Sequence, residues 1–225
     1  MKKKKSNGNS KQLGALYKSR EIRWFFKNNN QYIMQWFSNQ GIEFSKTEPR
    51  TDFYLPLPGK EDLSIKLREG NIEIKQRTQS PVGHSLTARA IGSLEHWDKW
   101  SFDVEDQDGL STSITKEKGY NWTAVYKERI GVKVTTNDDG TVDIRNIKEE
   151  VSFGCQIEYT RLLIDKEEWF TFGLEWFGSQ DQKIGSELLE KLIGASTLCQ
   201  KDSMGYNAFL NKILWDNGTT HPHSP

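Results

Sequence analysis

Apolar and polar residues alternate with a period of two along much of this chain, which predicts β-strands with one apolar and one polar face. The alternation is clearest at residues 63–68 and 72–77, which flank Glu69-Gly70-Asn71 and are predicted to form a hairpin. The polar face of this hairpin carries Lys, Arg and Glu. The same period predicts further strands at residues 20–27, 51–57, 99–104, 120–130, 132–135, 142–147, 155–160 and 170–176.

Other segments place apolar residues at helical spacing. Near the start of the chain, Ile33, Trp36 and Phe37 predict a helix that ends at Gly41. After Gly178 the period changes again, and two more helices are predicted at residues 184–193 and 206–214. We expect these helices to cover the apolar outer face of the sheet.

Composition limits the protein class. The chain has 225 residues, 28% charged and 35% hydrophobic, which suits one folded domain. We expect this domain at residues 13–217, with disordered tails at 1–12 and 218–225. A net charge of zero argues against a general nucleic-acid-binding surface, and no apolar run of about 18 residues predicts a membrane span. Two cysteines without metal spacing and no signal-peptide pattern make a cytoplasmic protein the expectation.

The charged strand faces have two interpretations. In the first, the face is solvated and its Lys–Glu pairs are ordinary surface pairs. In the second, about eight antiparallel strands close into an α+β barrel or tunnel, with the charged faces inside and helices outside. Carboxylates inside such a tunnel would hold Mg²⁺ or Mn²⁺, and basic side chains would converge on the phosphates of a polyanion. The basic residues concerned are Lys66, Arg68, Lys75, Arg77, Lys127 and Arg129.

A series of short motifs follows in order along residues 20–178. They are Arg20-Glu21-Ile22-Arg23-Trp24-Phe25, Thr51-Asp52-Phe53-Tyr54, residues 63–70, residues 72–75, residues 125–129 and Phe172-Gly173-Leu174-Glu175-Trp176. Their order resembles that of the CYTH superfamily, the triphosphate tunnel metalloenzymes. That family has an opening Glu-x-Glu-x-Lys strand, an Asp-x-Tyr strand, several basic strands and a late acidic strand.

The resemblance implies a tunnel that binds a triphosphate or polyphosphate and hydrolyses it with Mg²⁺ or Mn²⁺. The opening motif is degenerate, however. Arg23 stands where the second Glu of the motif belongs, and Phe25 stands where its Lys belongs. A carboxylate replaced by Arg inverts the local charge at the expected metal site, so no catalytic residue is assigned. The metal ligands that the resemblance implies are Glu21, Glu158 and Glu175.

Several function classes therefore stay open. The protein is either a metal-dependent triphosphatase acting on an inorganic or organic triphosphate, or a non-catalytic module of the same fold that binds a phosphorylated small molecule or polyphosphate. A requirement for a divalent cation would separate these two. A third class is an interaction protein whose partner surface is formed by tryptophans, namely Trp97, Trp100, Trp122 and Trp169. The sequence leaves the substrate, the metal and the oligomeric state undetermined.

Overall fold

The computed structural model describes residues 16–103, 109, 112–114, 122–137, 139–178 and 182–216. The tails predicted at 1–12 and 218–225 lie outside these residues, as do residue 104 and residues 120–121 of two predicted strands. In chain order the elements are β1 (Tyr17–Phe26), α1 (Gln31–Asn39), η1 (Phe44–Lys46), β2 (Arg50–Leu55), β3 (Leu63–Arg68), β4 (Asn71–Arg77), β5 (Val82–Thr87), β6 (Ala90–Asp103), β7 (Thr123–Thr136), β8 (Val142–Asn146), β9 (Gly154–Ile164), β10 (Glu167–Phe177), α3 (Ser186–Ile193), η3 (Gln200–Asp202), α4 (Tyr206–Asn211) and the π-helical turn η4 (Lys212–Asp216).

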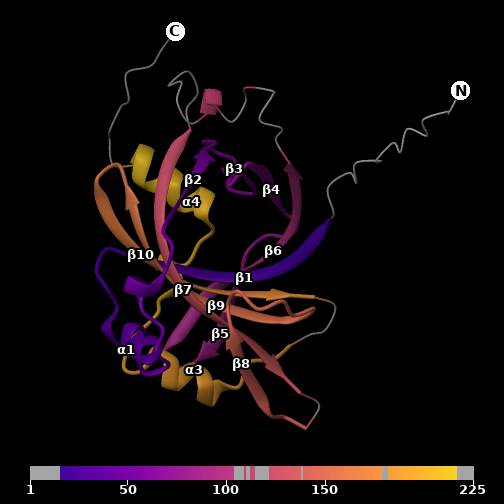
Figure 1. Cartoon of the computed structure of the whole chain (residues 1–225), viewed down its shortest axis with the longest axis vertical. Coiled ribbons are helices and arrows are strands. Elements are labelled where there is room, and N and C mark those ends of the chain that lie inside the picture. The colour runs from indigo at the N-terminus through magenta and orange to yellow at the C-terminus, as the bar shows by residue number, and fades with distance from the viewer. Residues whose placement is uncertain are drawn as a thin grey trace, which may run out of the picture.

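In the described part of the chain, eight antiparallel strands close into a barrel. Their order is β1-β10-β9-β7-β2-β3-β4-β6, and the pairing of β1 with β6 completes the ring. Two further strands extend the sheet, because β5 pairs with β6 and β8 pairs with β7. Figure 1 shows the ring, with β1 crossing to meet β6. The predicted α+β class and antiparallel barrel are confirmed.

Tight turns fix the register of two hairpins in this barrel. Arg68 pairs with Asn71 across the β3–β4 turn, and the two residues between them have positive φ, 49° at Glu69 and 78° at Gly70. The β9–β10 turn has the same form, with positive φ at Asp165 and Lys166. Turns of this kind match the right-handed twist of the flanking strands, so each hairpin holds its charged residues in one register.

The apolar core lies between the outer face of the barrel and helices α1 and α3. Trp24 and Phe172 stack with their centroids 5.9 Å apart, and both side chains are fully buried. Ile33 of α1 and Leu192 of α3 belong to the same buried cluster. These two helices therefore cover the outer face, as predicted. Within the described residues, no helix is both long and apolar enough to cross a membrane.

Helix α4 differs from the prediction, because it packs inside the barrel rather than on its outer face. Phe25 faces inward with Glu21 and Arg23, since alternate residues of a strand share a face. The ring of Phe209 in α4 stacks on Phe25 at 3.9 Å between centroids. The other members of this buried cluster also come from inward-facing strand positions and from α4: Tyr54, Val125, Leu162, Ile164 and Leu210. Helix α4 therefore packs against the inward faces of β1, β2, β7 and β9 at one end of the barrel.

Some strand predictions were incomplete. The alternation did not predict β5, whose first four residues are exposed and which therefore needs no apolar face. Strand β6 begins at Ala90 rather than at residue 99, and its outward position 92 is glycine. A Cβ at Gly92 would lie 2.3 Å from Ile22 Cγ2, so the close packing of β1 against β6 excludes a side chain there. The strands predicted at 120–130 and 132–135 form one continuous β7.

Candidate functional site

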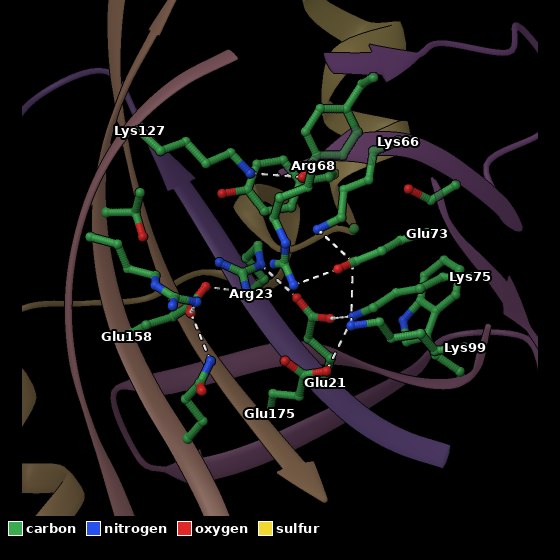
Figure 2. A pocket seen from close by; sticks show the side chains of 18 of the residues that line it. Glu21, Arg23, Lys66, Arg68, Glu73, Lys75, Lys99, Lys127, Glu158 and Glu175 are labelled. Atoms are coloured by element: carbon green, nitrogen blue, oxygen red, sulfur yellow. Dashed lines mark hydrogen bonds and ion pairs between the residues drawn. The ribbon is translucent and has the colours of Figure 1, made fainter. Parts of the chain in front are cut away.

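A pocket lies inside the barrel, and every strand of the closed ring contributes to its lining. The period of two decides which residues face it: β3 supplies Ser64, Lys66 and Arg68, while the residues between them face outward. The segment that leads into α4 contributes Gly205, and α4 contributes Tyr206. The remaining lining residues are Glu21, Arg23, Arg50, Tyr54, Glu73, Lys75, Trp97, Lys99, Lys127, Arg129, Gln156, Glu158, Thr160 and Glu175. Figure 2 shows the labelled charged side chains among them pointing toward one another.

The lining has an excess of positive charge. Among the described residues, eight Lys and Arg side chains line the pocket against four carboxylates. One more carboxylate, Asp52, is fully buried beside the lining and forms ion pairs with Arg50 and Lys127. Counting Asp52, cations still exceed carboxylates by three. The interpretation that places the charged strand faces inside the barrel is therefore correct, and the interior favours an anion.

Glu73 is the carboxylate around which the first group of cations gathers. Its Oε2 lies 3.0 Å from Lys66 Nζ and 3.3 Å from Lys99 Nζ. Arg68 pairs with the other oxygen of the same carboxylate. Burial raises the pKa of Glu73, but the charges of Lys66, Arg68 and Lys99 outweigh burial and lower the pKa to about 2. The carboxylate is thus ionised at neutral pH and holds these cations in place.

Asp52 organises a second group deeper in the barrel. Lys127 Nζ lies 2.9 Å from Asp52 Oδ2 and donates a hydrogen bond to the Tyr54 hydroxyl at 2.7 Å. The Tyr206 ring stands against the same ammonium, 4.0 Å from ring centroid to Nζ. Burial nevertheless lowers the pKa of Lys127 to about 7, and burial together with the Arg68 charge lowers that of Lys66 to about 8. Burial and neighbouring cations therefore disfavour the charged form of both lysines, and a bound anion would stabilise that form.

Arg23 forms the third group, with two carboxylates. Its Nε lies 2.6 Å from Glu21 Oε1, and its Nη2 lies 2.7 Å from Glu158 Oε1. Burial acts to lower the pKa of Arg23, but Glu21 and Glu158 raise it well above its ordinary value, so the guanidinium stays charged. Burial raises the pKa of Glu21, but the charges of Lys75 and Arg23 outweigh burial and lower this pKa to about 2. Glu175 is linked to this group through Lys75, whose Nζ lies 3.2 Å from Glu175 Oε1.

The structure brings most of the predicted site residues together. Among the basic set, Lys66, Arg68, Lys75, Lys127 and Arg129 line the pocket. Arg77 is not among the described lining residues; its side chain pairs with Glu95 at 2.8 Å. The carboxylates that the family resemblance implies as metal ligands, which are Glu21, Glu158 and Glu175, also line the pocket.

Some lining residues were not predicted. Arg50 precedes Asp52 by two positions on β2, so the strand period alone would have placed it on the same inward face. Lys99 was visible as a polar position in an alternating strand, but only the pairing of β4 with β6 brings it beside Glu73. Tyr206 carried no signal in the sequence, because the inward position of α4 comes from tertiary packing.

Comparison with known proteins does not identify a family for this chain. No protein-family model and no curated protein matches the chain. Among solved structures, the PH1012 protein from Pyrococcus horikoshii OT3 is 18% identical with a TM-score of 0.39, over 81% of this chain and 93% of that chain. A conserved hypothetical protein from Pyrococcus furiosus is 13% identical with a TM-score of 0.39, over 84% and 98%. Similarity at this level carries no argument about a ligand.

Proposed function

We propose that the pocket binds a triphosphate or a short polyphosphate. The observation that carries this proposal is the excess of lining cations over carboxylates, eight lining Lys and Arg against four lining Glu plus Asp52 in the described residues. A compact polyanion neutralises this excess positive charge. A neutral or cationic ligand would instead add to the free-energy cost of removing the cations from water. The motif order that resembles the CYTH superfamily supports the same ligand class.

The arrangement of the cations supports a phosphate chain in particular. Arg forks bind phosphate oxygens bidentately and Lys adds point charge, and both kinds of group are present. The cations come from six of the eight strands of the ring, while β9 and β10 contribute carboxylates, so the cations meet a ligand from several sides. Glu73 and Asp52 already hold them in fixed positions, which lowers the entropy cost of ordering long side chains on binding.

Hydrolysis of the bound triphosphate with Mg²⁺ or Mn²⁺ stays a prediction from the resemblance, alongside the alternative of a module that binds without turnover. Phosphate release from tripolyphosphate, ATP and thiamine triphosphate in Mg²⁺, Mn²⁺ or EDTA separates the two. Release that requires the metal and is lost in Glu175→Gln establishes an enzyme. Binding without release establishes a binding module.

The binding proposal is tested by calorimetric titration of the full chain with tripolyphosphate, pyrophosphate and phosphate. We expect affinity to fall in that order, because fewer cations are neutralised. The double variant Lys66→Met with Arg68→Met should reduce tripolyphosphate affinity by at least about a hundredfold, if each lost contact costs about 1.5 kcal/mol. The control Lys46→Met with Lys148→Met removes the same charge from exposed surface positions. Equal affinities in the two double variants would overturn the proposal.

A further inference from the structure

The carboxylates Glu21 and Glu158 are already neutralised by side chains of the protein itself. One oxygen of each contacts the Arg23 guanidinium, at 2.6 Å for Glu21 and 2.7 Å for Glu158. The second oxygen of Glu21 lies 3.1 Å from Lys75 Nζ. The second oxygen of Glu158 accepts a hydrogen bond from Gln156 at 2.9 Å and lies 3.3 Å from Arg129 Nη1. Each of these four oxygens therefore has a cationic or amide donor.

The barrel is shaped to hold the guanidinium between these carboxylates. Gly173 stands opposite Arg23 on β10, and a Cβ at this position would lie 2.8 Å from Cζ, Nη1 and Nη2 of Arg23. A glycine at 173 thus leaves the space that the guanidinium fills. Thr171 Oγ1 lies 3.4 Å from Nη1, and the Tyr206 ring centroid lies 4.9 Å from Cζ. The side chain of Arg23 is 4% exposed, so the group is enclosed on every side.

This donor set does not fit a divalent metal. In the described residues, no group of three or more His, Cys, Asp or Glu side chains is placed to hold a metal ion. A metal between Glu21 and Glu158 would have to displace a buried guanidinium from both carboxylates, leaving its charge unpaired. Breaking a buried ion pair in this way is strongly unfavourable.

We infer that the Arg23 guanidinium is a built-in cation that takes the place of a divalent metal between Glu21 and Glu158, so that the pocket binds polyphosphate without a metal ion. The part of this inference that concerns the ligand rests on the proposed function. Mg²⁺ in solution then competes with the protein, because it binds the phosphate oxygens and reduces their charge. Added Mg²⁺ weakens binding instead of supporting it.

The first experiment measures Mn²⁺ binding to the protein alone, by loss of the electron paramagnetic resonance signal of free Mn²⁺. The wild type should bind no Mn²⁺ in the pocket. Arg23→Glu replaces the internal cation by a further carboxylate and should bind Mn²⁺ in the pocket, where the wild type binds none. Arg23→Gln, which removes the internal cation and frees one oxygen each of Glu21 and Glu158, serves if Arg23→Glu does not fold. Mn²⁺ binding by the wild type that is lost in Glu21→Gln would overturn the inference.

The second experiment titrates tripolyphosphate into the wild type in EDTA and in excess Mg²⁺. The affinity for tripolyphosphate measured in EDTA should exceed that measured in excess Mg²⁺. Treating the protein with EDTA beforehand should change its affinity by less than about twofold, since no bound metal is removed. Binding that requires Mg²⁺ would refute the built-in cation. If tripolyphosphate binds under neither condition, the proposed function fails, and the Mn²⁺ experiment still decides the role of Arg23 because it uses no polyphosphate.

Discussion

Glu73 offers the sharpest test of the charge balance, because its removal should affect stability and binding in opposite directions. We consider Glu73→Gln, which keeps the shape of the side chain and removes its charge. Glu73 is 4% exposed and contacts Lys66, Arg68 and Lys99. A carboxyl pKa lowered from 4.5 to about 2 corresponds to about 3 kcal/mol of folded-state stabilisation at neutral pH. This stabilisation is present above pH 4.5 and is lost as pH falls toward 2.

The same substitution should strengthen binding of the ligand. Glu73 Oε2 lies 3.0 Å from Lys66 Nζ, and under the proposed function a phosphate oxygen on the other side of that ammonium would lie at about the same distance. The carboxylate and the phosphate are then about 6 Å apart, and their repulsion at an effective dielectric constant of about 20 is about 3 kcal/mol. Allowing for screening, we expect tripolyphosphate affinity to rise by about 10- to 100-fold.

Urea unfolding followed by Trp fluorescence measures the first effect, and calorimetric titration with tripolyphosphate measures the second. Glu128→Gln is the matched control, because it removes the same charge from the outer face of β7, where Glu128 pairs with Arg161. The control should leave the affinity nearly unchanged. If Glu73→Gln lowers the unfolding free energy and also leaves binding unchanged or weaker, the cations around Glu73 form a structural ion-pair cluster and not a ligand site.

Further predictions concern pH, packing and the barrel end. Tripolyphosphate affinity should fall as pH rises through the pKa of Lys127, about 7, and of Lys66, about 8, because binding is coupled to proton uptake by these lysines. Calorimetry in buffers of different ionisation enthalpy measures this proton uptake, and Lys127→Met should reduce the number of protons taken up. Without ligand, Lys127 should make stability rise with pH from about 7 to 10, since the unfolded chain binds more protons there. Gly92→Ala should destabilise the fold by about 1–3 kcal/mol in urea unfolding, whereas Gly185→Ala, with open space around it, should change stability by less than about 1 kcal/mol. Phe209→Ala removes the ring stacked on Phe25 and should cost about 3–5 kcal/mol; a thermal melt equal to that of the wild type would contradict this packing.

The sequence predicted the strands of the ring well wherever one face is buried and the other is charged. Residues 63–77 show why: a strict period of two and a Glu-Gly turn leave one register for the hairpin. The same periodicity did not predict β5, because its exposed residues need no apolar face. The apolar stripe of α4 was recognised as a helix, but a stripe does not say whether it packs outside a barrel or inside it.

The candidate site was predicted to the extent that it depends on strand periodicity. Lys66, Arg68 and Lys127 belong to alternating segments, and their inward position followed from the closed barrel. The partners of these residues were not predictable in the same way, because ion pairs between distant strands depend on register and on ring closure. Arg23 was recognised as a departure from the family motif, but its place between Glu21 and Glu158 depends on the empty space at Gly173 across the β1–β10 pair.

The position of α4 decides how a polymeric ligand can enter the barrel. A tube open at both ends lets a long chain slide through, whereas Phe209 and Leu210 fill one end of this barrel with an apolar plug. If the proposed function holds, a polyphosphate would be held by its terminus in the pocket and would not pass through the barrel past α4. Affinity should grow with chain length only until the terminal phosphates reach the plug, and longer chains would gain nothing further from the pocket.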